Sequence, residues 1–281
     1  MRIGIVGLGL IGGSLGLDLR QRGHHVVGVS RQAQTIALAE ELGVADQAWP
    51  DCGRLQDREV VFVCTPTEHV LPTIQILSTV LEFGTVITDV ASVKGSIVPS
   101  AESLWSAFVG GHPMAGTEQQ GIRAARPLLF ERRPYVLTPT RRTATEALER
   151  VEFLVKDLGA NLYRMDPDLH DLSVARISHL PVFVSAALLL NLASADDRQA
   201  EQLASSGFYD TTRVGGGNPQ LGESMARWNR AALLNELKHY RKTLDRFEKA
   251  IERSDWATVT ELLAASRDLR TRVFPAQDEY C

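Results

Sequence analysis

Short apolar stretches alternate with longer amphipathic stretches along the first 165 residues of the chain. The apolar stretches are three to five residues long, which suits β-strands buried on both faces of a sheet. The longer stretches, such as residues 70–81, have helical spacing. This alternation predicts an α/β domain with a doubly wound, mostly parallel sheet. The expected strands are residues 2–6, 25–29, 60–64, 85–88, 107–109 and 135–138.

The pattern becomes helical after Leu162 and Tyr163, where the sheet is expected to end. Asp166 and Pro167 predict a helix start, because proline is favoured in the first turn. Residues 182–190 are almost wholly apolar, too few to span a membrane and suited to a core or a subunit interface. We therefore predict an α/β domain over residues 1–165 and an all-α domain over residues 166–281.

An apolar stripe with alternating spacings of four and three residues runs through the second predicted domain. Such a stripe needs a partner helix, from the same chain or from a second copy. Packing within the chain is the simpler interpretation, but a stripe beside an all-apolar helix in a small domain favours a homodimer. The stripe consists of Leu233, Leu237, Tyr240, Leu244, Phe247 and Ile251.

Composition and charge argue against several classes of function. The 281 residues carry a net charge of −4, which offers no basic surface for nucleic acid or an anionic membrane. Cys52, Cys64 and Cys281 are scattered and lack the spacing of metal ligands, and this sparse usage favours a reducing compartment. We therefore expect a cytoplasmic protein with a small-molecule substrate and no metal, nucleic acid or membrane as a partner.

Three glycines in the pattern G-x-G-x-x-G link the first expected strand to a helix. Gly7 makes a tight turn, Gly9 lets the backbone approach a pyrophosphate, and Gly12 lets strand and helix pack closely. The helix N-terminus adds N–H groups and a positive dipole. Because the second expected strand follows at the right distance, we predict a Rossmann-like dinucleotide-binding domain. The cofactor contacts expected from this turn are Gly7, Leu8, Gly9, Leu10, Ile11 and Gly12.

The residues after the second strand predict which cofactor is bound. NAD-selective folds place an acid there to hold the ribose 2′-hydroxyl. This chain has Ser30 and Arg31 instead, with no carboxylate before Glu40. Ser30 can donate to a 2′-phosphate and Arg31 can pair with it, so we predict NADP. Arg31 as an exposed helix-start arginine is the alternative, but it leaves the missing acid unexplained.

Polar residues follow the other strands, at the edge where doubly wound sheets bind ligands. Thr65 and Pro66 are expected beside the cofactor, and His112 near the nicotinamide. Histidine is the natural general base near neutral pH, although a histidine bonded within the core is the alternative. Ser92 is either a catalytic partner or the cap of the next helix. Lys94 either meets an anionic substrate or is a solvated surface residue.

Several motifs occur together over nearly the whole chain. They are the glycine turn at residues 7–12, DVASVK at 89–94, GGHPMAGTEQQG at 110–121, ISHLP at 177–181 and SSGFYDTTRVGGGNP at 205–219. With these motifs the chain resembles the prephenate and arogenate dehydrogenases of tyrosine biosynthesis. It is most similar to the short, single-function cyanobacterial type.

The resemblance implies the chemistry and the site residues. A ring hydroxyl is oxidised by hydride transfer to the cofactor, and carbon dioxide leaves as the ring becomes aromatic. His112 would accept or polarise the hydroxyl proton, Ser92 would orient the hydroxyl, and Thr117 would line the site. Arg213 would hold a substrate carboxylate with its guanidinium fork, with a surface arginine as the alternative. The resemblance also implies a homodimer formed by the helical domain.

The substrate follows from a difference within the ISHLP motif. His179 either contacts the substrate or stabilises the helix start. Many prephenate-using relatives carry a second histidine where this chain has Val182, so a polar contact to the ketoacid side chain is absent. The ammonium of arogenate needs acceptors instead, such as backbone carbonyls or Asp210. We therefore predict arogenate as substrate, with prephenate as the alternative and with Val182 as a packing residue if selectivity lies elsewhere.

Two other classes of protein are compatible with a dinucleotide-binding domain. A regulator that senses NADP would keep the fold without turnover, and it would need no base at His112. A related enzyme acting on a hydroxy acid explains the Gly-Phe-x-Asp-x-x-Arg segment less well. The dehydrogenase is therefore the preferred hypothesis.

Overall fold

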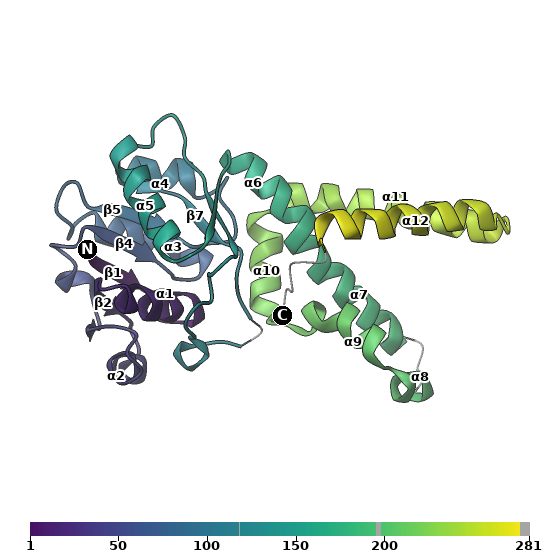
Figure 1. Cartoon of the computed structure of the whole chain (residues 1–281), viewed down its shortest axis with the longest axis horizontal. Coiled ribbons are helices and arrows are strands. Elements are labelled where there is room, and N and C mark those ends of the chain that lie inside the picture. Colours follow the sequence, from purple (N-terminus) through teal and green to yellow (C-terminus); the bar gives the residue numbers. More distant parts are fainter. Residues whose placement is uncertain (118, 195–197, 276–281) are drawn as a thin grey trace. The chain divides into compact units, whose positions relative to one another are not determined.

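The computed structural model describes residues 1–117, 119–194 and 198–275. The chain divides into two compact units, Met1–Arg230 and Ala231–Cys281. The first unit contains the described strands and most of the described helices, and the described part of the second is mainly helical (Figure 1).

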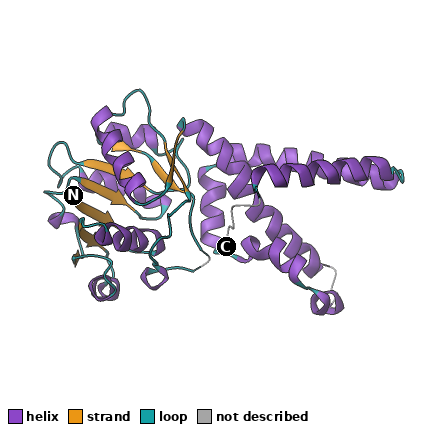
Figure 2. Cartoon of the chain, viewed as in Figure 1, coloured by secondary structure: helices purple, strands orange, loops and turns teal. Residues whose placement is uncertain are grey.

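A parallel sheet forms the centre of the first unit (Figure 2). It has six strands in the order β3-β2-β1-β4-β5-β6. The chain starts in the middle and winds to both sides, which is the order of dinucleotide-binding folds. This confirms the predicted fold class. The strands are β1 (Arg2–Val6), β2 (His25–Val29), β3 (Gln47–Trp49), β4 (Val60–Val63), β5 (Val86–Asp89) and β6 (Phe108–Val109).

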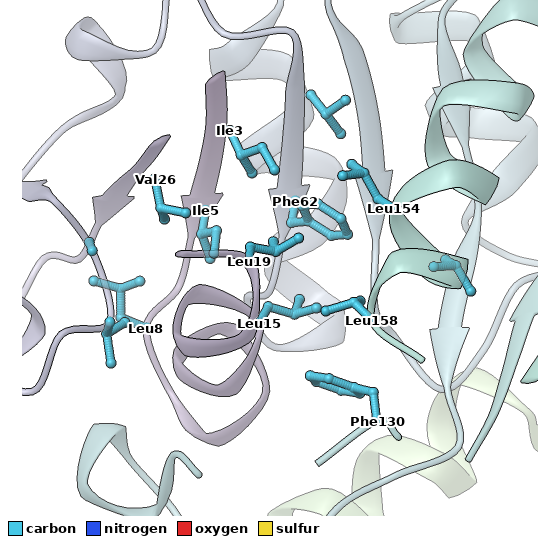
Figure 3. Packing of buried hydrophobic residues seen from close by; sticks show 14 of the residues in the cluster. Ile3, Ile5, Leu8, Leu15, Leu19, Val26, Phe62, Phe130, Leu154 and Leu158 are labelled. Atoms are coloured by element: carbon cyan, nitrogen blue, oxygen red, sulfur yellow. The ribbon is translucent and has the colours of Figure 1, made fainter. Parts of the chain in front are cut away.

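Helices cover both faces of this sheet and bury one hydrophobic cluster on each side. On one face, Leu15 and Leu19 pack with Ile5, Phe62 and Leu154 (Figure 3). The other face packs helices α3 and α4 against the strands. The apolar strands have this composition because both of their faces are buried. The helices are α1 (Leu10–Gln21), α2 (Ala33–Glu41), α3 (Thr67–Leu77), α4 (Val98–Leu104) and α5 (Thr145–Asp157), with short 3₁₀ turns at Cys52–Arg54 and Ile122–Ala124.

A second, three-stranded sheet has the order β7-β8-β9, antiparallel between β7 and β8 and parallel between β8 and β9. The strand expected at residues 135–138 therefore forms, but it does not join the main sheet. At Gly111 the chain passes so close to β5 that a Cβ atom would lie 2.8 Å from the Asp89 carbonyl oxygen. The chain turns there into β7 and pairs with a later segment. The strands are β7 (Gly111–Pro113), β8 (Pro134–Leu137) and β9 (Asn161–Arg164).

Helices complete the first unit. Asp166 caps α6, as its side chain accepts from the backbone N–H of Asp168 and Leu169. A π-helical turn then joins α6 to α7, and α7 carries the apolar stretch noted in the sequence. The segments are α6 (Pro167–Val174), the π turn (Ala175–His179), α7 (Leu180–Ser194), α8 (Arg198–Leu203), α9 (Ser206–Thr212), a 3₁₀ turn (Arg213–Gly216) and α10 (Pro219–Trp228).

The helix from α6 to α7 is continuous over Pro167–Ala193, and an 18-residue window within it has a mean hydropathy of 1.6, which would suit a membrane span by length and composition. The expectation that the apolar stretch is too short for a span therefore holds for residues 182–190 alone, because the helix is longer than that stretch. The same helix carries His170, Asp171 and His179 in buried polar contacts with the rest of the first unit.

The second unit contains the helices α11 (Arg230–Glu252) and α12 (Trp256–Val273). The predicted apolar stripe lies on α11, where Leu244 and Ile251 are exposed. Leu263 and Leu269 of α12 are exposed as well. Apolar side chains in water at helical spacing are a surface that a partner would cover.

Candidate active site

The turn between β1 and α1 has the geometry of a pyrophosphate-binding loop. Gly7 has a φ of +98°, and a Cβ atom there would lie 2.6 Å from the carbonyl oxygen of Cys64. A Cβ atom on Gly12 would lie 2.0 Å from the Gly7 oxygen, whereas one on Gly9 would meet nothing within 4 Å. Gly9 also precedes α1, whose first turn holds no acid. The turn thus fits an anionic cofactor group at Gly9, and the flanking Leu8, Leu10 and Ile11 remain predicted contacts.

Ser30 and Arg31 lie in the turn between β2 and α2. The Ser30 hydroxyl accepts from the backbone N–H of Gln32 at 3.3 Å, and the Arg31 side chain is exposed. The nearest acid along the chain, Glu40, accepts from the N–H of Ala48 at 3.1 Å. A hydroxyl and a guanidinium therefore face this turn without a carboxylate in it.

Thr65 and Pro66 follow β4, at the same edge of the sheet as the glycine turn. Pro66 directly precedes α3. The Thr65 hydroxyl is buried and has no hydrogen-bond partner among the described residues. A buried hydroxyl without a partner is costly, so a bound ligand atom here would satisfy it. Both residues remain predicted cofactor contacts.

A buried ion pair ties the end of β5 to β7. Lys94 is fully buried, and its ammonium donates to the Asp89 carboxylate and to the Gly111 carbonyl oxygen. Asp89 also accepts from the backbone N–H of Ala91 and of Gly111, at 3.0 and 3.2 Å. Burial lowers the pKa of Lys94, and the Asp89 carboxylate opposes that shift. Lys94 is thus not the solvated surface lysine of one interpretation, and its contact with an anionic substrate remains a prediction.

His112 lies on β7, with 8% of its surface exposed. Its Nδ1 atom is 2.9 Å from Nε2 of His170, and the two rings meet edge to face with centroids 5.1 Å apart. Burial lowers the pKa of His112 well below its usual range, and His170, Lys94 and His179 lower it further. A neutral imidazole near pH 7 is free to accept a proton, which suits the role expected of His112.

His170 and Asp171 on α6 extend this contact, and neither residue was predicted from the sequence. Nδ1 of His170 lies 2.8 Å from Oδ1 of Asp171. The Asp171 carboxylate also accepts from the backbone N–H of Lys94 and Gly95, at 2.7 and 2.8 Å. A Cβ atom on Gly95 would lie 3.0 Å from Asp171, so glycine permits the close approach of α6. The detectable signal was an adjacent histidine and aspartate one turn after a capped helix start.

His179 is fully buried at the end of the π turn. The Asn229 side-chain amide donates to the backbone oxygen of Asp171 at 2.7 Å and lies 3.3 Å from Nδ1 of His179. Nε2 of His179 has no partner among the described residues. Burial lowers the pKa of His179 to about 4, with His170 lowering it further and Asp171 opposing the shift. In an uninterrupted α-helix residues 170 and 179 would point about half a turn apart, so the π turn changes their alignment.

Ser92 and Thr117 lie in loops beside this cluster in sequence. Ser92 is half-buried, and the next helix, α4, begins at Val98 with Ile97 before it. Ser92 therefore does not cap that helix, and the alternative interpretation as a cap is wrong. The Thr117 hydroxyl accepts from the backbone N–H of Gln119 at 3.2 Å. Their contacts with a substrate remain predictions.

Arg213 begins the 3₁₀ turn after α9 and is exposed. The segment is held on α7 by Ser185, whose hydroxyl donates to the Thr211 oxygen at 3.0 Å and accepts from the Gly215 N–H at 2.8 Å. A Cβ atom on Gly215 would lie 2.3 Å from the backbone nitrogen of Ala186, so this contact requires glycine. The fold therefore fixes the backbone at Arg213 while leaving its guanidinium in solvent.

Contacts among residues 1–117, 119–194 and 198–275 thus join three predicted site residues, Lys94, His112 and His179, through His170, Asp171 and Asn229. No described contact joins Ser92, Thr117 or Arg213 to this group. The same described part of the chain holds no cluster of three potential metal ligands.

Two family models match the chain. The model for the nucleotide-binding domain of prephenate dehydrogenase matches residues 15–164, and the model for its dimerization domain matches residues 166–265. A prephenate dehydrogenase from Bacillus subtilis (strain 168) is 30% identical over 95% of this chain and 74% of its own length. A cyclohexadienyl dehydrogenase from Zymomonas mobilis is 27% identical over 95% of this chain and 94% of its own length.

Solved structures give the same similarity. The crystal structure of Synechocystis arogenate dehydrogenase is 47% identical and superposes with a TM-score of 0.87, covering 98% of this chain and 100% of its own. Prephenate dehydrogenase from A. aeolicus, in complex with hydroxyphenyl propionate and NAD+, is 28% identical with a TM-score of 0.92. It covers 98% of this chain and 99% of its own.

Proposed function

The chain belongs to the prephenate dehydrogenase family of oxidoreductases, and on that premise we propose that it converts L-arogenate to L-tyrosine with NADP. The ring carbinol loses a hydride to NADP, and the bond to the ring carboxylate breaks to release carbon dioxide. The products are tyrosine, NADPH and carbon dioxide. The observation that carries the dehydrogenase role is His112, a buried imidazole held neutral at the ligand-binding edge of the fold.

His112 accepts the hydroxyl proton of the substrate while the hydride leaves. It returns that proton to the ring oxygen once the carboxylate carbon has departed and the ring is aromatic. Ser92 orients the hydroxyl by a hydrogen bond. A half-buried serine whose side chain does not cap the next helix supports this role. Proton transfer by a positioned side chain accounts for roughly 10²- to 10⁴-fold of rate.

The cofactor, when bound, supplies a nicotinamide ring that accepts the hydride. Gly7–Gly12 backbone groups would hold its pyrophosphate, and Thr65 with Pro66 would line its path toward the site. Ser30 and Arg31 would hold the 2′-phosphate. The absence of a carboxylate from that turn supports NADP over NAD.

The substrate contacts are proposed from Arg213, His179, Thr117 and Lys94. Arg213 pairs with a carboxylate through its exposed guanidinium. Since Asn229 donates toward Nδ1 of His179, the neutral His179 ring carries its proton on Nε2 and can donate to a substrate oxygen. Lys94 is the fourth proposed contact, and its charge adds to the effect of burial in lowering the pKa of His112.

Arogenate is proposed over prephenate for two reasons. The arogenate dehydrogenase of Synechocystis is 47% identical over 98% of the chain. Val182 offers no donor to a ketoacid side chain, and Asp210 is an exposed acid near Arg213 in sequence. Prephenate dehydrogenase is the second candidate, because relatives such as that of Bacillus subtilis carry this name. A Cβ atom on Gly222 would lie 3.8 Å from the Val182 side chain, which favours the packing role of Val182 in that case.

We also propose the assembly and the division of labour. Residues 1–165 bind the cofactor, and residues 166–281 bind the substrate and form a homodimer. The match to a dimerization domain and the exposed apolar residues of α11 and α12 support the dimer. Light scattering that gives the mass of one chain would contradict it. The cytoplasm is the proposed location, as for a biosynthetic enzyme with reduced cysteines.

The test is a side-by-side assay of the purified protein with arogenate and prephenate, each with NADP and NAD. We expect the highest kcat/KM for arogenate with NADP, and a gain of prephenate activity in the Val182→His variant. A higher kcat/KM for prephenate would assign the second candidate function. Binding of NADP without turnover of either substrate, or of small 2-hydroxy acids, would indicate a sensor.

A further inference from the structure

Three buried side chains are joined in a series by consecutive hydrogen bonds. The reaction proposed above assigns no role to two of them, His170 and Asp171. Asp171 lies 2.8 Å from Nδ1 of His170, and Nε2 of His170 lies 2.9 Å from Nδ1 of His112. His170 is 1% exposed, and Asp171 and His112 are 8% exposed. The series runs from α6 to β7 and ends at the ring proposed to act as the base.

The donor and the acceptor of each hydrogen bond follow from which atoms carry a proton. The Asp171 carboxylate can only accept, so Nδ1 of His170 must donate to it. In the arrangement proposed here, His170 carries one proton, on Nδ1, so its Nε2 is bare and can only accept. The hydrogen bond between the two rings therefore requires the proton on Nδ1 of His112. This leaves Nε2 of His112 with a free lone pair.

The anchor of the series is rigid. The two Asp171 oxygens accept from the backbone N–H of Lys94 and of Gly95, at 2.7 and 2.8 Å. Asn229 donates to the Asp171 backbone oxygen at 2.7 Å. Gly95 admits this approach because it has no Cβ atom. The carboxylate is therefore held on the loop that carries Lys94. It cannot rotate toward another partner without breaking its two hydrogen bonds from backbone N–H groups.

We propose that His170, held by Asp171, is a positioning residue that fixes the tautomer of His112 so that Nε2 accepts the substrate proton. The inference deepens the proposed function and rests on it for the identity of the proton donor. When His112 takes up the proton, it becomes a donor at both nitrogens, and its Nδ1–H keeps the bond to His170. No bond in the series has to break during the reaction.

The direct test reads the tautomer without turnover. Nitrogen–proton correlation spectra of the full protein carrying isotope-labelled histidine assign the protonated ring nitrogen, and the His112→Asn variant identifies the His112 signals. We expect a neutral His112 with its proton on Nδ1. A proton on Nε2, or a charged ring at pH 7, overturns the inference. Because the spectra need no substrate, this result stands whether or not the protein oxidises arogenate.

Kinetics of matched variants provide the second test. Gln can accept from Nδ1–H of His112, whereas Leu cannot, so His170→Leu should lose at least about tenfold in kcat and His170→Gln should recover part of it. The KM for NADP should stay unchanged in both. His239→Gln, at an exposed histidine of α11, is the control and should match the unmodified protein. Equal kcat for the Leu and Gln variants would overturn the inference, and so would loss confined to KM. If His170→Leu fails to fold, the spectra and the Gln variant still decide.

Discussion

The turn at residues 7–12 and the polar cluster around His112 serve one proposed reaction but are built differently. The turn uses backbone geometry within six consecutive residues, with Gly7 at positive φ and Gly12 against the Gly7 oxygen. The cluster joins side chains from β5, β7, α6, the π turn and the residue after α10. It contains two histidines with lowered pKa values, whereas the turn contains no titratable side chain.

This difference separates what each region can control. A backbone turn binds an anion through N–H groups that do not titrate, so it determines cofactor affinity. A buried cluster determines which protons are present and where they are, so it controls chemistry and responds to pH. Changes in the turn should therefore alter cofactor binding and folding, and changes in the cluster should alter turnover and pH dependence.

The largest effect is expected from Gly12→Ala. The new Cβ atom would lie 2.0 Å from the Gly7 oxygen, so strand and helix must separate. We expect loss of measurable NADP binding and a fall of roughly 1–3 kcal/mol in unfolding free energy. Gly9→Ala is the matched variant, because a Cβ atom there meets nothing within 4 Å. It should keep its stability and lose only cofactor affinity. Equal unfolding curves for the two variants would show that the turn is not packed in this way.

The next largest effect concerns the dependence of the unfolding free energy on pH, to which His179 should contribute. The pKa of His179 is about 4 in the folded protein, below its ordinary value of roughly 6.5. Between these values the unfolded chain binds a proton that the folded chain does not, so stability falls as pH falls through this window. We expect the unmodified protein to lose roughly 2–3 kcal/mol more than His179→Gln between pH 7.5 and 4.5. The charged or titratable neighbours of this ring are His112, His170 and Asp171.

Urea unfolding at several pH values measures that difference. His239→Gln, which removes an exposed histidine, serves as control and should follow the unmodified protein. If the unfolding free energies of His179→Gln and of the control change with pH in parallel, His179 is not the source of the loss of stability at acid pH.

Arg213→Ala tests a residue outside both regions. The loss of a charge-assisted bond to a substrate carboxylate is worth roughly 1.5–3 kcal/mol, which predicts a rise of about 10- to 100-fold in the KM for arogenate. The KM for NADP should stay nearly constant. Arg213→Lys keeps the charge without the planar fork. Its KM for arogenate should lie between those of the unmodified protein and Arg213→Ala. Steady-state kinetics decide, and a change confined to kcat would remove the carboxylate contact.

The smallest effect is expected from Arg31→Ala in the cofactor-binding part of the chain. An exposed charge pair contributes up to about 1 kcal/mol, so kcat/KM with NADP should fall about fivefold. NAD lacks the 2′-phosphate, and its kcat/KM should not change. The ratio of the two kcat/KM values in one preparation measures the cofactor preference. An unchanged ratio would show that Arg31 does not determine this preference.

The same contrast explains what could be predicted from the sequence. Five strands of the main sheet, the glycine turn and the helix start at Asp166 depend on local patterns, and they appear where expected. The short edge strand β3 was not predicted. The strand at residues 135–138 was predicted, but its partner was not, because periodicity does not specify which strands pair. Lys94 was considered as a surface residue because its buried partner, Asp89, lies across a turn whose path the sequence does not show.

His170, Asp171 and Asn229 were missed for a related reason. The contacts of Asp171 with Lys94, of His170 with His112 and of Asn229 with Asp171 all arise from tertiary packing, which local sequence patterns do not show. The π turn, which alters the alignment of His179, has no simple sequence pattern. Conversely, Ser92 preceded a predicted helix closely enough to suggest a cap, but the helix begins six residues later.

The separation of the two regions is tested most directly by two measurements on one variant, His112→Asn. We expect NADP to bind this variant with a Kd within about twofold of that of the unmodified protein, since the turn is untouched. The rate of NADPH formation in a single turnover with arogenate should fall by roughly 10²- to 10⁴-fold, the weight of a positioned base. A variant that turns over at the original rate, or one that loses its rate only because NADP no longer binds, would contradict the separate roles of the turn and the cluster.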